Sequence, residues 1–440
     1  MDLLLVIIAS YFIISKTKLE WALVIILALG TSLFQANKFF ENSYLIPNMY
    51  DGALALSILL FARFYSRKIK NTESYNQIKK TLFAFLAFVL ITFIIDIVMN
   101  SISISSILKT SRHWIIMLLM FLTIPKLPAE TLYKALNITL KITLVISVII
   151  VVEHLAETSY FTKVEYDIFG KKRGALPSTF AMFYALLVYT DYFKLSKVKK
   201  YTYLIILVAS LLVSSTRSIA LGILLAFIIC IYFQSKDKFS SMFKIVLFAI
   251  AVYAISFALP TLNKRFTEAI AEVTATQKGS KDIEGNMTFR LYILAERYEY
   301  LKNNPIHYLF GIGNVVENDF KDVFNIGLYN EDSEIIQLDT GDISWPLILL
   351  RLGMLGLLIY LIWSFKFISI ISKYKKDPLA LSTMAYIITT IFIVSFASSN
   401  FARGTFWMMP TICLWLIIQR SQEKNLFIKN GNNNDCNSNL

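Results

Sequence analysis

The sequence predicts an all-α polytopic membrane protein with about thirteen transmembrane helices (roughly twelve to fourteen) and one large outward-facing loop that contains short helices. The first observation is composition, because 56% of the 440 residues are hydrophobic, 17% are charged and the mean hydropathy is +0.59. The second is a series of apolar runs that reach or approach membrane-spanning length. The third is the clustering of basic residues in alternate short loops. These observations argue against a soluble chain of several domains.

Each apolar run comes near the roughly 20 residues that a membrane-spanning helix needs. The runs lie at about 2–15, 20–36, 51–66, 81–99, 112–124, 137–155, 174–193, 201–215, 217–233, 242–260, 344–365, 379–397 and 405–419. The first run lacks a basic segment before it and a small-residue cleavage site after it, so we expect a retained span and not a signal peptide. The predicted parts are an N-terminal bundle of about ten spans (1–260), a large extracytoplasmic loop (261–343), three further spans (344–420) and a disordered, Asn-rich cytoplasmic tail (421–440).

Basic residues assign the two sides of the membrane. When the spans alternate, the lysine and arginine clusters of the short loops fall on one side, which the positive-inside rule makes the cytoplasm. The clusters are Lys16 and Lys18; Arg67, Lys68, Lys70, Lys79 and Lys80; Lys126 and Lys134; Lys194, Lys197, Lys199 and Lys200; Lys236 and Lys238; and Lys373, Lys375 and Lys376. The C-terminus is then cytoplasmic, and the N-terminus and the loop 261–343 lie outside. The net charge of +13 therefore reflects topology and does not indicate a nucleic-acid partner.

Two outer segments have unusual charge. The loop 261–343 carries 8 Lys and Arg against 14 Asp and Glu, and this acidic balance fits a translocated segment. By contrast, Lys171, Lys172 and Arg173 break the charge rule, because they fall on the outer side. This basic patch is either a local exception or a group that attracts a phosphorylated or acidic substrate.

Motifs of metal sites and of soluble enzymes are lacking. Cys230 and Cys413 lie inside apolar runs and Cys436 lies in the polar tail, so the cysteines suggest neither a disulfide framework nor a metal site. The sequence has no HExxH, Walker, DxD or Ser/His/Asp pattern. Gly311 and Gly313 follow no predicted strand and have no third glycine, so they do not indicate a dinucleotide site. We expect no cofactor and no metal.

Arg217 is the first candidate for binding an anion. It lies in Ser214-Ser-Thr-Arg-Ser218, which joins two apolar runs almost without a loop, at or just inside the outer membrane boundary. An arginine at a membrane helix centre costs about 2.5–3.5 kcal/mol, and less near the interface. Arg217 therefore either snorkels to the interface or binds an anionic headgroup together with the first amides of the next helix.

Arg290 is the second candidate. The stretch from Asn286 to about Leu301 reads as an amphipathic helix that ends before Pro305, and Arg290 and Arg297 share one face of it with leucines. Such a helix either lies on the membrane surface or acts as a lid that points a guanidinium into a site.

Asp342 is the candidate base, because it lies at the mouth of the span that follows the loop. A carboxylate at a half-buried boundary can have a raised pKa and accept a proton. The alternative is an acid that interacts favourably with a helix N-terminus. Other outer residues that could line the site are Arg403, Arg112 and His113. Asp96, Glu153 and His154 also lie near outer helix ends, and the alternative given for Asp342, an interaction with the helix end, applies to them as well.

Three motifs, in this order, resemble those of the O-antigen polymerase and O-antigen ligase superfamily, which includes Wzy-type polysaccharide polymerases. They are SSTRS at the short connection, TFRLYILAERYEYLKNNPIHYLFGIGN in the large loop and DISWPLILLRLGMLG at its end. The resemblance covers roughly Leu204 to Leu361. It implies a metal-independent glycosyltransferase of the bacterial inner membrane, with a periplasmic loop and a GT-C-like architecture, that acts on glycans linked to undecaprenyl diphosphate. The resemblance implies that Arg217 and Arg290 correspond to the superfamily's two motif arginines. Ligases of the superfamily commonly have His where this chain has Asp342, and this difference favours a polymerase.

Glycosyl transfer without a metal needs positive charge from arginine to stabilise a leaving diphosphate. We hypothesise that Arg217 and Arg290 hold the donor diphosphate, while Asp342 accepts the proton of the acceptor hydroxyl as it attacks the anomeric carbon with inversion. The residues predicted to bind substrate are Lys172, Arg173, Arg297 and Arg403. The predicted partners are the lipid-linked glycan donor and acceptor, the lipid bilayer and a chain-length regulator.

Three other functions remain open. A ligase would transfer the glycan to lipid A-core, a flippase or exporter would move a lipid-linked oligosaccharide without making a bond, and a scaffold would do neither. Transporters often contain internal repeats. No repeat is evident between the halves of this chain, and its 83-residue loop is longer than alternating access requires.

Overall fold

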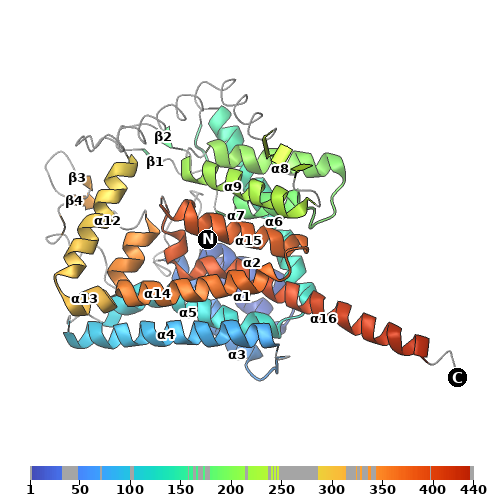
Figure 1. The fold of residues 1–440 in the computed structure, drawn as a ribbon, viewed down its shortest axis with the longest axis horizontal. Coiled ribbons are helices and arrows are strands. Elements are labelled where there is room, and N and C mark those ends of the chain that lie inside the picture. Colours follow the sequence, from blue (N-terminus) through green and yellow to red (C-terminus); the bar gives the residue numbers. More distant parts are fainter. Residues whose placement is uncertain are drawn as a thin grey trace.

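The computed structural model describes part of the chain. The described residues are 2–31, 48–69, 72–99, 104–156, 158–161, 165–166, 172–173, 179–213, 217–235, 239–240, 242–243, 245–246, 286–313, 324, 328–329, 335–337, 343–396 and 398–436. Helices dominate the fold and pack side by side as a bundle (Figure 1). This confirms the predicted all-helical architecture at the level of fold class.

The helices and strands have the following bounds. The helices are α1 (Asp2–Ser15), α2 (Leu19–Gly30), α3 (Met49–Phe64), α4 (Glu73–Met99), α5 (Ile104–Thr123), η2 (Ile124–Lys126), α6 (Ala129–Leu155), α7 (Thr179–Tyr189), α8 (Lys197–Val213), α9 (Arg217–Gln234), α12 (Asn286–Lys302), α13 (Pro305–Phe310), α14 (Ser344–Ser372), α15 (Pro378–Phe392), η5 (Val394–Phe396), η6 (Asn400–Ala402), η7 (Gly404–Trp407) and α16 (Met408–Cys436). Two short antiparallel pairs join β1 (Glu165–Tyr166) to β2 (Lys172–Arg173) and β3 (Leu328–Tyr329) to β4 (Ile335–Gln337). Every predicted apolar run coincides with one of these helices except the run at 242–260, which lies largely outside the described residues.

Several of the described helices are able to cross a membrane. Five are long and apolar enough by themselves, and they cover residues 73–95, 107–126, 129–155, 344–372 and 378–396. Shorter apolar helices cover residues 3–15, 19–30, 180–189 and 218–234. On α4, Leu90, Ile94 and Val98 are exposed at four-residue intervals, which forms an apolar stripe suited to lipid. The protein is therefore a multi-pass membrane protein.

Lysine-rich turns meet at one end of the bundle, which we call the lysine end. Lys126, after α5, donates a hydrogen bond to the backbone oxygen of Tyr65, after α3, across 2.7 Å. Arg63 of α3 donates to the backbone oxygen of Ile14 in α1 across 3.2 Å. The opposite end, where α12 and α13 lie beside α14, is called the loop end (Figure 1).

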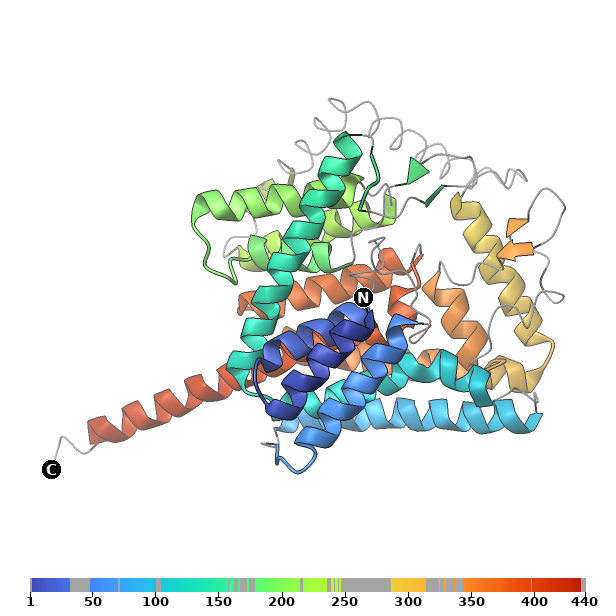
Figure 2. The same cartoon turned by 180° about the vertical axis from the view of Figure 1, so that it is seen from behind.

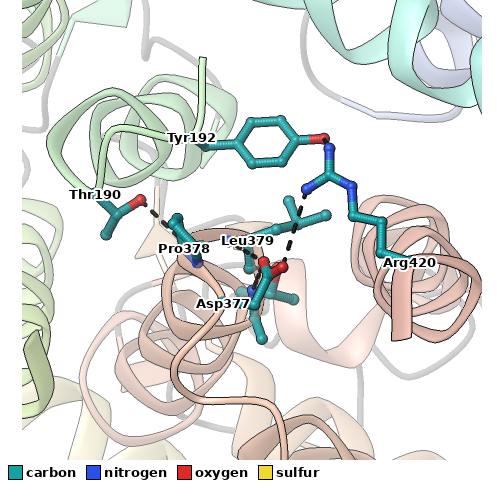
Figure 3. A network of polar contacts seen from close by, with 8 residues as sticks. Thr190, Tyr192, Asp377, Pro378, Leu379 and Arg420 are labelled. Carbon is teal, nitrogen blue, oxygen red and sulfur yellow. Dashed lines mark hydrogen bonds and ion pairs between the residues drawn. The ribbon is translucent and has the colours of Figure 1, made fainter. Parts of the chain in front are cut away.

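A polar network closes the lysine end between α7, α15 and α16 (Figure 3). Asp377 accepts hydrogen bonds from the first backbone amides of α15, and its second carboxylate oxygen lies 4.0 Å from the guanidinium of Arg420. Arg420 also donates to the hydroxyl of Tyr192 across 3.1 Å and covers its ring. Burial raises the pKa of Tyr192, so its phenol stays protonated. Thr190 adds a hydrogen bond of 3.3 Å to the carbonyl of Pro378, so the end of α7 and the start of α15 are tied to α16.

Aromatic side chains fill the centre of the bundle. Tyr360 and Trp363 of α14 are buried against Trp407, and the ring centroids of Trp363 and Trp407 lie 4.2 Å apart. The hydroxyl of Tyr360 accepts a hydrogen bond from Nε1 of Trp407 at 2.8 Å and donates to the backbone oxygen of Phe401. These bonds fix the segment η6–η7, which carries Arg403.

The long helix α14 is broken at Gly353, where φ is +64°. The backbone amide of Ile312, just after α13, donates to the carbonyl of Leu350 across 2.8 Å. Gly311 has a φ of +80°, and a Cβ there would come within 2.4 Å of the backbone of Arg351. Irregular backbone inside an apolar helix is tolerated where protein groups satisfy it, and the segment after α13 does so here.

The predicted loop helix is confirmed as α12, and it ends at Lys302, before Pro305. A second short helix, α13, then begins at Pro305, because the side chain of Asn304 accepts a hydrogen bond of 2.9 Å from the amide of Ile306. Leu301 and Ile312 are buried against Leu349 and Leu350 of α14. The loop helices therefore pack on the bundle through their own small apolar core.

The C-terminal helix departs from the predicted disordered tail, because α16 continues to Cys436. Its last turns project away from the bundle (Figures 1 and 2). The buried apolar run ends at Ile418. Gln422, Glu423 and Lys424 follow it, and they are strong helix formers, which accounts for continuation of the helix beyond the packed core.

Candidate functional site

A salt bridge joins α5 to α3 at the loop end. Nη1 of Arg112 lies 2.9 Å from Oδ1 of Asp51, and the side chains are 14% and 44% exposed, respectively. The guanidinium also lies over the ring of Tyr50, 5.3 Å from its centroid. Asn48 caps α3 by accepting a hydrogen bond of 3.0 Å from the amide of Tyr50. This cap starts the helix so that its first turn carries both Tyr50 and Asp51 beside α5.

Arg403 reaches the same place from the turn between η6 and η7. Its Nη1 donates to the hydroxyl of Tyr50 across 2.9 Å. Ser344, at the start of α14, holds this segment by donating to the carbonyl of Ser398 across 2.6 Å. Gly404 packs so closely on α5 that a Cβ would come within 2.5 Å of its backbone, which is why a residue without a side chain is needed there.

A third arginine completes the group. Arg351, two residues before the break in α14, lies with Arg112 and Arg403 within electrostatic range of the ring of His113. The ring of His113 in turn meets that of Tyr50 edge-on at 4.4 Å. Three arginines from three separate elements therefore converge with one histidine. We call this group the arginine cluster; its members are Tyr50, Asp51, Arg112, His113, Arg351 and Arg403.

The arginine cluster is suited to binding an anion. Asp51 pairs with Arg112, whereas the described partner of Arg403 is a neutral phenol. A group with more guanidinium than carboxylate charge attracts anions, and guanidinium matches the geometry of phosphate oxygens. Among the described residues, no group of three or more His, Cys, Asp or Glu side chains is placed to hold a metal ion.

The two predicted arginines of α12 have different surroundings. Arg290 is half-buried. Arg297 is fully buried, forms an ion pair with Glu296 and lies over the ring of Phe324 at 4.1 Å from its centroid. The contact with Phe324 joins α12 to that residue, and neither arginine belongs to the arginine cluster.

Of the other predicted site residues, some are described only at the level of their helix or strand, and one lies outside the described part of the chain. Arg217 is the first residue of α9, so it stands where helix amides are not yet paired. Lys172 and Arg173 form β2, opposite β1. Asp342 lies outside the described residues, immediately before Ile343, where the described chain resumes.

One segment of the chain matches a known family. Residues 202–361 match the family model described as O-antigen ligase. The match relates this segment to the O-antigen ligase and polymerase superfamily. Members of this superfamily are glycosyltransferase-like enzymes that use lipid-linked glycans in a membrane setting. The matched segment runs from α8 through the break in α14, so it contains Arg217, Arg290 and Arg351. A comparison with curated proteins found no match.

The sequence did not single out Tyr50, Asp51 or Arg351 as members of a site. One signal was available, because a charged residue within an apolar helix usually has a partner inside the protein. Arg112 and Asp51 both meet this description, but they are 61 residues apart in sequence. The pairing therefore depends on how α3 packs on α5.

Proposed function

We propose that this protein polymerises undecaprenyl-diphosphate-linked oligosaccharide repeat units into an O-antigen or capsular-type polysaccharide. The observation that carries the proposal is the match of residues 202–361 to the O-antigen ligase family, because this segment contains Arg217, Arg290 and the loop between them. We further propose about thirteen spans in a GT-C-like bundle, located in the bacterial inner membrane with the loop end in the periplasm. The lysine-rich turns at the opposite end support that orientation.

The proposed reaction is an inverting, metal-independent transfer. An acceptor hydroxyl oxygen attacks the anomeric carbon of the donor glycan and forms the new glycosidic bond, while the bond from that carbon to the diphosphate oxygen breaks. Asp342 takes the hydroxyl proton, and Arg217 and Arg290 stabilise the negative charge that develops on the leaving diphosphate. The products are a chain longer by one unit, carried on the lipid diphosphate of the acceptor, and the free undecaprenyl diphosphate released from the donor.

The position of Asp342 favours a polymerase over a ligase, because the ligases that the sequence resembles commonly have histidine there. A carboxylate at a half-buried boundary can also act as the base, because burial raises its pKa. A ligase would join a finished chain to lipid A-core in one transfer, whereas a flippase would move the lipid-linked unit and form no bond. A chain-length regulator is a further proposed partner of the polymerase.

Substitution of the donor-binding arginines tests the proposal in cells. Arg217→Ala and Arg290→Ala are each produced in a strain that lacks the native protein, and glycan length is measured beside protein abundance in the membrane. We expect normal membrane insertion and loss of long chains. The matched control is Lys302→Gln, since Lys302 is an exposed cation on the same helix as Arg290. Long chains from either arginine variant at normal abundance would refute the diphosphate clamp.

A further inference from the structure

Two arginines of the arginine cluster lie about two turns inside their helices. Arg351 stands seven residues after the start of α14, and Arg112 stands eight residues after the start of α5. At 1.5 Å per residue, these positions lie about 10–12 Å along the helices from their loop ends. Charged side chains at such positions are costly in a membrane and usually mark a substrate or ion site. Arg112 does not snorkel to the surface, because it is largely buried and points at Asp51.

The polar groups of the cluster are incompletely satisfied. Nε of Arg112 and Nδ1 of His113 are buried and have no hydrogen-bond partner within the described part of the chain. Buried polar atoms normally have such a partner. The hydroxyl of Tyr50 and the carboxylate of Asp51 are the contacts that occupy Arg403 and Arg112. The phenol of Tyr50 is a neutral acceptor, so a charged phosphate group would form a stronger bond with Arg403 than the phenol does.

Exposure indicates how a ligand would enter. The Asp51 side chain is 44% exposed, whereas that of Arg112 is 14% exposed. An anion arriving at the cluster would therefore meet Asp51 first and take its place on Arg112. The ion pair keeps the guanidinium oriented until that exchange occurs.

A polymerase has to bind two lipid diphosphates at once, one on the growing chain and one on the incoming unit. The proposed donor clamp uses α9 and α12, whereas the arginine cluster is built from α3, α5, α14 and the η6–η7 segment. We propose that the arginine cluster binds the diphosphate of the acceptor, the lipid-linked repeat unit whose sugar hydroxyl attacks. The assignment to the acceptor rests on the proposed function. The diphosphate leaves this site unchanged in the reaction, because its own glycosidic bond is kept.

Counting bound lipid tests this second site. The full-length protein is placed in nanodiscs, and the number of undecaprenyl diphosphate molecules bound per chain is measured by native mass spectrometry. We expect two for the wild type and one for Arg403→Gln. Arg217→Ala should also bind one, and the combination of Arg403→Gln with Arg217→Ala none. The matched control is Arg63→Gln, since Arg63 lies on α3 at the lysine end, and it should bind two.

Substitutions at the ion pair separate ligand binding from structural support. Asp51→Asn removes the competing carboxylate, so the second site should bind undecaprenyl diphosphate at least as tightly as the wild type. The paired variant Asp51→Asn/Arg112→Gln leaves no lone charge and should fold, yet it should bind one lipid. If Asp51→Asn instead lost the second lipid while the paired variant kept it, the ion pair would be purely structural and the proposal would be overturned.

Competition identifies the source of the diphosphate. Inorganic pyrophosphate should compete weakly and phosphatidylglycerol should not compete, because the site needs both a diphosphate and a membrane-anchored tail. Displacement of the second lipid by phosphatidylglycerol at equal concentration would make it a general anionic-lipid site and overturn the proposal. If the protein bound two lipids but formed no polymer, the proposed polymerase activity would be contradicted, whereas the presence of two diphosphate sites would still be supported. Polymerisation by Arg403→Gln at the wild-type rate would contradict the acceptor site alone.

Discussion

Gly311 and Gly353 bring two backbone segments into direct contact where the loop helices pack against the broken helix α14. A Cβ on Gly353 would come within 2.5 Å of the backbone nitrogen of Gly311, and a Cβ on Gly311 would come within 2.4 Å of the backbone of Arg351. Both glycines have positive φ, +80° and +64°. Backbone of the segment that follows α13 therefore touches backbone of a membrane-spanning helix next to a cluster arginine.

The first prediction concerns this contact. Gly311→Ala and Gly353→Ala should each separate α13 from α14, because the left-handed conformation costs a residue with a side chain about 1–2 kcal/mol and the added carbon has no space. We expect faster hydrogen exchange at residues 305–313 and loss of chain elongation. Gly30→Ala is the control, since its added carbon would lie 3.2 Å from the flexible side chain of Met408 and in ordinary contact with Ala53. Unchanged exchange in both variants would show that the contact does not hold the loop.

The second prediction concerns the Tyr360 hydroxyl. In Tyr360→Phe the buried Nε1 of Trp407 and the carbonyl of Phe401 both lose a partner. Each unsatisfied group costs about 1–3 kcal/mol, so Tm in detergent should fall, and Arg403 should lose its fixed position. The control Tyr11→Phe changes an exposed tyrosine and should leave Tm unaltered. Equal Tm values for the two variants would contradict this role.

The third prediction concerns pH. Burial lowers the pKa of His307 on α13 below its usual range. The unfolded value is about 6.5, so an undocked α13 takes up a proton at a higher pH than the docked helix does. Docking should therefore be fully stable above about pH 6.5 and weaken as pH falls below it, until the folded pKa is passed. Hydrogen exchange of α13 between neutral and mildly acidic pH, corrected for intrinsic rates, measures this, and His307→Gln should remove the dependence.

The fourth prediction concerns Asp342. If it is the base, Asp342→Asn should slow chain elongation by about 10²–10⁴-fold, while binding of lipid-linked repeat units stays intact. Asp339→Asn changes a carboxylate three positions earlier and should elongate chains normally. Full activity of Asp342→Asn would remove the proposed base.

The spans and the loop helix could be predicted because they depend on local patterns. Apolar runs have the length of spans, and Pro305 ends α12 by local sterics. By contrast, the local sequence around Gly311 and Gly313 indicated only that these glycines do not form a dinucleotide site. Their role depends on a positive φ at Gly353, about forty residues away, which no local pattern reveals.

Only some residues of the candidate site could be predicted from the sequence, and their contacts could not. Arg112, His113 and Arg403 stood out because they are charged or titratable residues near outer helix ends. Their common partner Tyr50 lies 353 residues before Arg403, and an apolar helix such as α3 can pack on its neighbours in several ways. Sequence periodicity specifies which face is buried but not which helix covers it.

Reconstitution with a defined substrate tests whether the protein polymerises lipid-linked repeat units. Purified protein is placed in vesicles with one labelled undecaprenyl-diphosphate-linked repeat unit, and the labelled products are separated by size. We expect a ladder that grows by whole repeat units, with one undecaprenyl diphosphate released for each new linkage. Label that stays in single repeat units, or that is transferred once to added lipid A-core without any ladder, would contradict this expectation.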